Sequence, residues 1–235
     1  MLWFLPLVFL LSVAQPAYAE DGFAAEDCSS YPEVPVQVTP VFPDPAFDYR
    51  QNINQIRALS GDGQHNIREE IPLGLTHYQP ILDVKVSTRM IDLPNGLTCA
   101  RIDHVDVTLG YRDVTVYVAS EIAPDSCGFN QVLDHEQKHI AVNRDVLARY
   151  APLIEQQLEV YLRDNGVFRE QNYGYAAQLA HDRMKNIVSD LAEQLSRENF
   201  ERQRDIDTQQ EYRRISLSCG GQLQTVAYRF LKTGL

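Results

Sequence analysis

The sequence predicts an α+β fold in which a small antiparallel sheet packs on a helix and is followed by long C-terminal helices. Three segments alternate apolar and polar residues with a period of two, at 84–88, 105–109 and 114–118. Turn-forming sequences separate them, "PNG" at 94–96 and "GYRD" at 110–113. From about residue 129 the apolar period becomes helical. We therefore expect a three-stranded meander ahead of the helices.

Residues 1–19, "MLWFLPLVFLLSVAQPAYA", are typical of a signal peptide. Their apolar run is too short to span a bilayer comfortably, and Ala17 and Ala19 are the small residues that a signal peptidase prefers. We expect cleavage after Ala19. No Lys or Arg precedes the apolar run, so a retained N-terminal anchor is the alternative. No later segment has the apolar length of a membrane helix.

The part of the chain after the signal peptide divides into an arm and one domain. Residues 20–46 include "CSSYPEVPVQVTPVFPDP", whose five prolines favour an extended arm. Residues 47–235 are predicted to form a single catalytic domain. It would contain a short helix at 47–59, a helical stretch at 129–163 that Pro152 breaks in two, and a long polar helix at 173–215. The apolar stripe expected on the last helix comprises Ala177, Ala180, Met184, Ile187, Leu191 and Leu195.

The charge of the chain excludes two classes of partner. There are 21 basic and 32 acidic residues, which gives a net charge of -11. Such a field opposes the approach of nucleic-acid phosphates and of anionic lipid surfaces. We expect no nucleic-acid partner, and no stable membrane span once the signal peptide is removed.

The four cysteines all follow the predicted cleavage point, and none forms a C-x-x-C pair. An even number of cysteines in an exported chain favours disulfides and a periplasmic or secreted location over metal binding by thiols. Four cysteines allow three connectivities. We predict Cys99 with Cys127 and Cys28 with Cys219, because each pair would tie a strand or a terminus to the central body.

The segment "QVLDHEQKHIAVNRDVL", residues 131–147, contains the strongest indication of chemistry. Residues four apart on a helix lie one turn above each other, so His135 and His139 can bind one ion while Glu136 reaches a water on it. This H-E-x-x-H spacing is the zinc signature of many metalloproteases. The helix has an apolar side on which to pack, formed by Val132, Leu133, Ile140 and Leu147. The alternative is a solvated polar face that contains two histidines by chance.

Three other histidines are predicted to be structural. His104 alternates on a strand, His65 follows a glycine loop, and His181 lies on the stripe of the long helix. A metzincin continuation is absent, because its Gly and third His positions hold Val142 and Asp145. Without a glycine to turn the chain, Asp145 should point away from the metal.

Several of these segments together resemble a known family. "GLTHY" at 74–78, a later cysteine-containing hairpin, "VTVYVASE" at 114–121 and "CGFNQVLDHEQKHIAV" at 127–142 are similar to an uncharacterised bacterial family of predicted secreted zinc-dependent proteases. The resemblance covers about residues 53–215. It implies a zincin-like peptidase that acts on peptide or protein substrates, with Zn²⁺ as cofactor and Glu136 as the general base. The strand "RDVTVYVAS" would bind an extended substrate at a sheet edge.

Two histidines leave a catalytic zinc short of the three protein ligands it needs. Helical spacing suggests Glu198, which continues the apolar stripe toward the body of the protein. The resemblance points instead to "IDTQQEY" at 206–212, where Asp207 and Glu211 are four residues apart. We predict Glu211 as the third ligand and Asp207 as a partner that orients an imidazole. The alternative for this segment is a solvated charged face.

The oxyanion stabiliser and the reaction itself stay open at this stage. Tyr117 and Tyr212 are the candidates for the former. The leading hypothesis is a periplasmic or secreted zinc metallopeptidase. The alternatives are an envelope binding or scaffold protein with a structural or vestigial metal, which a closed four-ligand site would favour, and a zinc hydrolase of cell-wall amide bonds.

Overall fold

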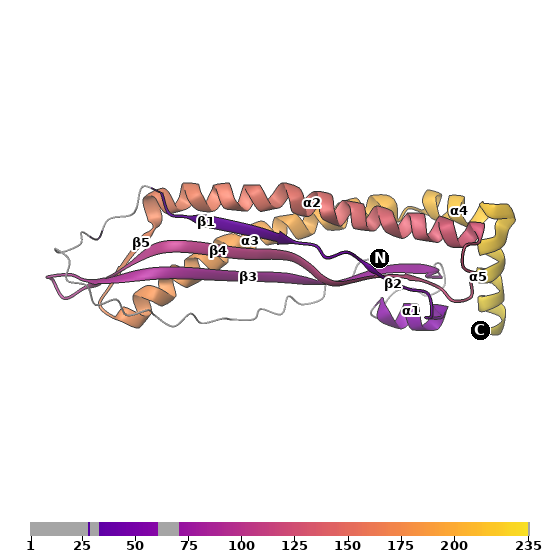
Figure 1. Cartoon of the computed structure of the whole chain (residues 1–235), viewed down its shortest axis with the longest axis horizontal. Coiled ribbons are helices and arrows are strands. Elements are labelled where there is room, and N and C mark those ends of the chain that lie inside the picture. The colour runs from indigo at the N-terminus through magenta and orange to yellow at the C-terminus, as the bar shows by residue number, and fades with distance from the viewer. Residues whose placement is uncertain (1–27, 29–32, 61–70, 235) are drawn as a thin grey trace.

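The computed structural model describes residue 28 and residues 33–60 and 71–234. It is an elongated α+β structure in which a long mixed sheet is covered by two long helices (Figure 1). The predicted α+β class is confirmed in this coarse form. The signal peptide at 1–19 and His65 lie outside the described residues.

A single β-hairpin forms the body of the sheet. Strand β3 (Gly74–Asp92) pairs antiparallel with β4 (Thr98–Val118) along nearly the whole length of both. The predicted turn at "PNG" joins them: the Leu93 N–H donates to Leu97 O at 2.8 Å, and Gly96 has a φ of 78°. A left-handed φ is easily adopted by glycine, which explains this residue at this position.

The prediction of two strands at 105–109 and 114–118 is wrong, because both segments belong to β4. The register with β3 continues across "GYRD", with Gly110 opposite Ile81 and Tyr111 opposite Pro80. Gly110 has another role. Its φ is 142°, and a Cβ there would lie 2.0 Å from Val41 O. The glycine allows the end of a neighbouring strand to approach, and it does not turn the chain.

Three short strands also pair with β4, and they make the sheet mixed. β1 (Val36–Val41) and β2 (Ala46–Asp48) are parallel to β4, whereas β5 (Val167–Glu170) is antiparallel to it. The predicted antiparallel meander is therefore wrong. Part of the predicted arm at 20–46 is extended as expected, but β1 is a strand of the sheet. Alternation of apolar residues indicates a strand and does not indicate its partner.

The helices differ from the prediction in two places, at Pro152 and after Ile206. α1 is Ile53–Leu59, and α2 runs unbroken over Cys127–Asn165 through Pro152. A proline removes one N–H donor, and the burial of Ala151 and Ile154 on either side stabilises the helix there. The predicted helix at 173–215 is two helices, α3 (Tyr173–Ile206) and α4 (Gln209–Leu217). A 3₁₀ turn, η1 (Cys219–Gly221), then leads to α5 (Gln222–Thr233).

Two apolar clusters hold these elements together. The larger lies between the sheet and helices α2 and α3, and the smaller joins α1, the start of α2, and the C-terminal helices. The predicted stripe on α3 is mostly confirmed, with Val188 more deeply buried than Ile187 and Ala176 more than Ala177. The members buried as predicted are Ala180, Met184, Leu191 and Leu195.

The predicted disulfides are wrong in their pairing. The structure joins Cys28 to Cys99 and Cys127 to Cys219. β4 has 21 residues, so at about 3.3 Å per residue its ends are roughly 66 Å apart. Cys99 lies near the first end, whereas Cys127 follows the second. The parallel register of β1 brings the chain before it beside Cys99. Two disulfides are consistent with an oxidising compartment outside the cytoplasm.

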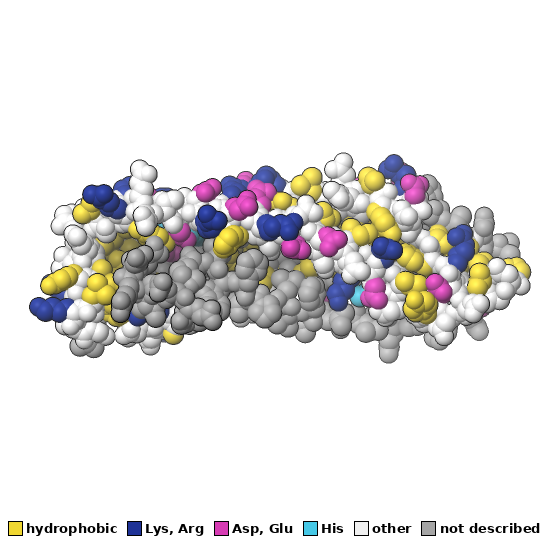
Figure 2. Space-filling model, turned by 180° about the vertical axis from the view of Figure 1, so that it is seen from behind, with side chains coloured by type: hydrophobic (Ala, Val, Ile, Leu, Met, Phe, Trp, Pro, Cys, Tyr) yellow, Lys and Arg dark blue, Asp and Glu magenta, His cyan; other side chains and the backbone are white. Residues whose placement is uncertain are grey.

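The surface carries charges of both signs. Acidic and basic side chains are interspersed over the face in Figure 2, and ion pairs such as Arg149–Glu198 and Arg202–Asp145 join α2 to α3. Across the described ranges, none of the helices combines the length and the apolar character needed to cross a membrane.

Candidate metal centre

The H-E-x-x-H segment lies in the first third of α2. The helix begins after Ser126, whose hydroxyl accepts a hydrogen bond from the Phe129 N–H at 3.1 Å. His135 and His139 follow on one side, with their Nε2 atoms 3.2 Å apart. Their side chains are only 7% and 12% exposed, so both imidazoles are held inside the protein. The solvated-face alternative is therefore excluded for these two residues.

Asp207 completes the group from the break between α3 and α4. Its Oδ1 atom lies 3.2 Å from His135 Nε2 and 3.2 Å from His139 Nε2. The Asp207 N–H donates to Gln203 O at 3.1 Å and ends α3, while the Thr208 hydroxyl accepts from the Glu211 N–H and caps α4. The helix break thus directs a carboxylate at the two histidines.

The three donor atoms have the spacing of a metal site. With zinc–ligand bonds of about 2.0–2.1 Å, tetrahedral geometry places ligands about 3.3–3.4 Å from each other. The observed separations are all 3.2 Å. Among the described residues, His135, His139 and Asp207 form the group that could hold a metal ion. Two imidazoles and a carboxylate are also a donor set that suits zinc.

The structure places Asp207, and not the predicted ligand Glu211, in the group that could hold a metal ion. Glu211 Oε1 lies 3.8 Å from His135 Nδ1 and binds Lys138 Nζ at 2.5 Å, and Arg214 binds the same carboxylate. Asp207, predicted only to orient an imidazole, faces both. The sequence did contain a signal of the break, since T-x-x-E at 208–211 is a typical helix start.

Among the described contacts, none joins Glu198 to His135 or His139. Its carboxylate pairs with Arg149 and lies 4.0 Å from Arg202. Asp145 points away from the centre as predicted, toward Arg149 and Arg202. His104 and His181 each lie beside a neighbouring aspartate, Asp106 and Asp182 respectively, and neither belongs to a potential metal-binding group among the residues that the structure describes.

The surroundings of Asp207 and Glu211 lower the pKa of both carboxyl groups. Burial alone would raise the pKa of Asp207, but hydrogen bonds with His135, His139 and Tyr212 hold that pKa well below its usual range. Hydrogen bonds from Arg214 and Lys138 lower the pKa of Glu211 to about 2. The site therefore presents negative charge to a cation.

Glu136 is buried between α2 and the start of β3. Its carboxylate is within 2.8 Å of the Thr76 hydroxyl, which donates to Oε2. Burial raises the pKa of Glu136, and the charges of His139 and His135 oppose this effect. A carboxylate with a raised pKa accepts a proton more readily than an ordinary carboxylate, as a general base must.

Gly74 provides the space that Glu136 occupies. A Cβ at Gly74 would lie 2.6 Å from Glu136 Oε1 and 2.6 Å from Val132 Cγ1. We predict that Gly74→Ala displaces the Glu136 carboxylate, and any reaction in which this carboxylate acts should then slow by roughly 10- to 100-fold. Zinc content should not change. Gly174→Ala is the matched control, because the nearest atom to its Cβ is 3.5 Å away. Equal activities of the two variants would contradict the prediction.

The structure distinguishes the two tyrosines predicted as candidates for stabilising an oxyanion. Tyr212 donates a hydrogen bond to Asp207 Oδ1 at 2.8 Å, and its ring centroid is 5.6 Å from that of His135. Tyr117 lies in β4 opposite Asp48 of β2 and Leu75 of β3, in the smaller apolar cluster. Because β2 pairs with one edge of β4 and β3 with the other at this point, the predicted substrate-binding strand "RDVTVYVAS" has no free edge here.

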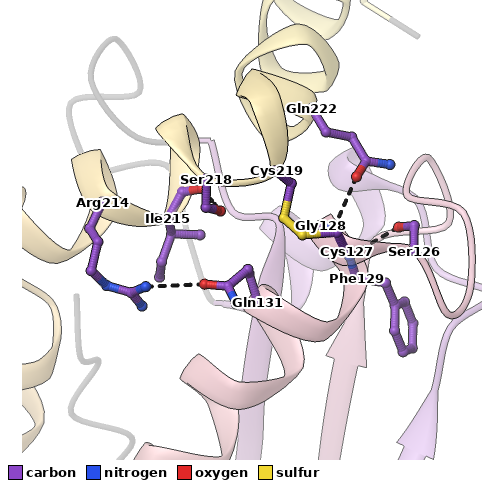
Figure 3. The surroundings of a disulfide bond; sticks show 10 residues. All are labelled: Ser126, Cys127, Gly128, Phe129, Gln131, Arg214, Ile215, Ser218, Cys219 and Gln222. Carbon is purple, nitrogen blue, oxygen red and sulfur yellow. Dashed lines mark hydrogen bonds between the residues drawn. A yellow bond between two sulfur atoms is a disulfide. The ribbon is translucent and has the colours of Figure 1, made fainter.

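A disulfide holds the C-terminal helices against the start of α2 (Figure 3). Cys127 is joined to Cys219, Arg214 donates to Gln131 Oε1 at 3.1 Å, and the Gly128 N–H donates to Gln222 Oε1 at 2.9 Å. Because α4 follows directly after Asp207, these contacts also limit where Asp207 can lie.

The two disulfides should differ in their effect on metal binding. They close loops of similar length, with sequence separations of 71 and 92, so each should restrain the unfolded chain by about 4–5 kcal/mol. We predict that Cys127→Ser with Cys219→Ser weakens zinc binding by about 10-fold, whereas Cys28→Ser with Cys99→Ser changes it little. Calorimetric titration at a temperature where both remain folded measures this. An equal loss in both pairs would mean that stability alone is responsible.

Comparisons with protein-family models, with curated proteins and with solved structures find no match to this chain.

Proposed function

We propose that this protein is a zinc-dependent peptidase that acts in the periplasm or after secretion. The observation that carries the proposal is the convergence of His135 Nε2, His139 Nε2 and Asp207 Oδ1 at 3.2 Å from one another. Glu136, with its raised pKa, lies beside His135 on the same helix. Three protein ligands among the described residues leave a fourth position of a tetrahedral ion for water or substrate.

The proposed chemistry divides between the ion and the chain. When bound, zinc would lower the pKa of a water to near ~7 and polarise the scissile carbonyl. Glu136 would accept a proton from the water that attacks the scissile carbonyl carbon, and would give that proton to the amine nitrogen as the C–N bond breaks. The Thr76 hydroxyl holds the Glu136 carboxylate in place. Tyr212 is the group we propose for stabilising the oxyanion, and to do so its hydroxyl would turn from Asp207 Oδ1, to which it donates at 2.8 Å, toward the substrate.

Strand β3 is the edge at which we propose that an extended substrate binds. Within the described part of the chain β3 pairs only with β4, and its Thr76 contacts Glu136. A peptide that adds to this edge would pass close to the metal centre, with its main chain held by β-sheet hydrogen bonds. Peptides and proteins are therefore the proposed substrates, with cell-wall amides as the alternative within the same chemistry.

Metal analysis and peptide cleavage by the chain starting at Glu20 test the proposal. We expect about one zinc per protein molecule and cleavage of a peptide library that a chelator abolishes and added zinc restores. A protein that is folded by circular dichroism but holds no zinc after zinc-replete expression would exclude the proposal. Zinc binding without hydrolysis of either peptides or cell-wall fragments would favour a structural metal in a scaffold protein.

A further inference from the structure

A buried ladder of side-chain amides lies beside His139, between α2 and α3. Its members are Asn143, Asn199 and Gln203, which are 0%, 5% and 1% exposed. Asn143 Oδ1 accepts from Asn199 Nδ2 at 2.8 Å and from Gln203 Nε2 at 3.1 Å. Asn199 Nδ2 also lies 3.3 Å from the Tyr111 hydroxyl of β4. Buried polar groups at this depth need partners, and these amides supply most of them to one another, with Asn143 Nδ2 left without a hydrogen bond among the described atoms.

The orientation of the Gln203 amide follows from its neighbours. Its Nε2 atom faces three acceptors, at 3.2 Å from His139 O, 3.1 Å from Asn143 Oδ1 and 3.4 Å from Asn199 Oδ1. The opposite orientation would place Gln203 Oε1 against three other oxygens and leave the NH₂ group facing the imidazole. Gln203 Oε1 is therefore the atom that forms the hydrogen bond with His139 Nδ1.

This orientation determines which nitrogen of His139 carries the proton. A carbonyl oxygen can only accept, so His139 Nδ1 must donate a hydrogen to Gln203 Oε1. In the neutral imidazole the lone pair is then on Nε2. That nitrogen faces His135 Nε2 and Asp207 Oδ1. The protein thus prepares His139 to bind a cation through Nε2.

We propose that Gln203 is a positioning residue that fixes the metal-binding tautomer of His139. The Gln203 side-chain amide is itself held by Asn143 Oδ1 and His139 O. The backbone oxygen of Gln203 also accepts a hydrogen bond from the Asp207 N–H at 3.1 Å. Gln203 therefore contacts two of the three residues that could bind the metal, His139 and Asp207. The proposal rests on the metal site of the proposed function. It goes beyond that function because it assigns a role to a residue that touches neither the ion nor the substrate.

Two variants test this role. Gln203→Met keeps the approximate size and removes the acceptor opposite Nδ1, whereas Asn199→Leu disturbs the ladder and leaves Gln203 Nε2 with His139 O and Asn143 Oδ1. We expect zinc binding about 10- to 100-fold weaker in Gln203→Met. It should stay within about 3-fold of the parent protein in Asn199→Leu. A purely structural role predicts losses of similar size in both variants, because each removes a buried amide from the ladder.

The tautomer itself can be measured without metal. Metal-free Asp207→Ala protein lacks the carboxylate that competes for the Nε2 proton of His139. Imidazole ¹⁵N shifts of this protein, at a pH where His139 is neutral, should show the proton on Nδ1, and adding Gln203→Met should shift population to Nε2–H. An unchanged tautomer in Gln203→Met, with zinc still bound by the parent protein, would overturn the inference and leave the proposed function standing. The expected tautomer, with no zinc bound by the parent protein, would support the inference and overturn the proposed function.

Discussion

Replacing Asp207 by Ala should weaken zinc binding by on the order of 100-fold or more. Loss of a residue that only orients a ligand typically costs 10- to 100-fold in metal affinity, and loss of a ligand should cost at least as much. Asp207 Oδ1 is 3.2 Å from both imidazoles, which is the position of a ligand. Competition with a chromophoric chelator measures the dissociation constant of each variant.

Glu211→Ala and Glu198→Ala are the controls for this experiment. Glu211 Oε1 is 3.8 Å from His135 Nδ1 and forms ion pairs with Lys138 and Arg214, so its loss should cost about 10-fold or less. Glu198→Ala should leave zinc binding unchanged. A large loss in Glu211→Ala together with little loss in Asp207→Ala would restore Glu211 as the ligand. Asp207→Asn, which keeps the size of the side chain, separates loss of charge from loss of packing.

Replacing Glu136 by Gln should lower the rate of hydrolysis by about 10²- to 10⁴-fold, the usual contribution of a general acid or base. Gln cannot accept a proton from water, but it has the same shape and can still accept the hydrogen bond of Thr76. Zinc content should therefore stay near one ion per chain. Single-turnover cleavage rates and metal analysis of the same preparation measure both quantities.

Thr76→Val is the control for the surroundings of Glu136. It removes the hydroxyl that donates to Glu136 Oε2 at 2.8 Å and keeps the size of the side chain. We expect a smaller loss of rate, because the base stays and only its orientation is less restricted. Loss of zinc in Glu136→Gln would show that Glu136 holds the metal centre together, and a general-base role would then be wrong.

The sequence alone determined the part of the site that is local in the chain. His135, Glu136 and His139 lie within five residues of one helix, and helical periodicity fixes their relative positions. The short-range hairpin turn at 94–96 and most of the apolar stripe on α3 were predictable for the same reason. In each case the residues concerned are neighbours in sequence, so backbone geometry suffices.

Only the tertiary structure decided which distant residues meet. Asp207, and not Glu211, faces the two histidines because α3 ends at Ile206. Asp207 therefore lies in the break between two helices, whereas Glu211 lies about one helical turn farther along, in α4. Cys28 meets Cys99 because β1 runs parallel to β4, a pairing that alternation of apolar residues does not encode. Gln203 had no sequence signal, since a glutamine on a charged helix is ordinarily exposed. Its burial against α2 is what brings it to His139.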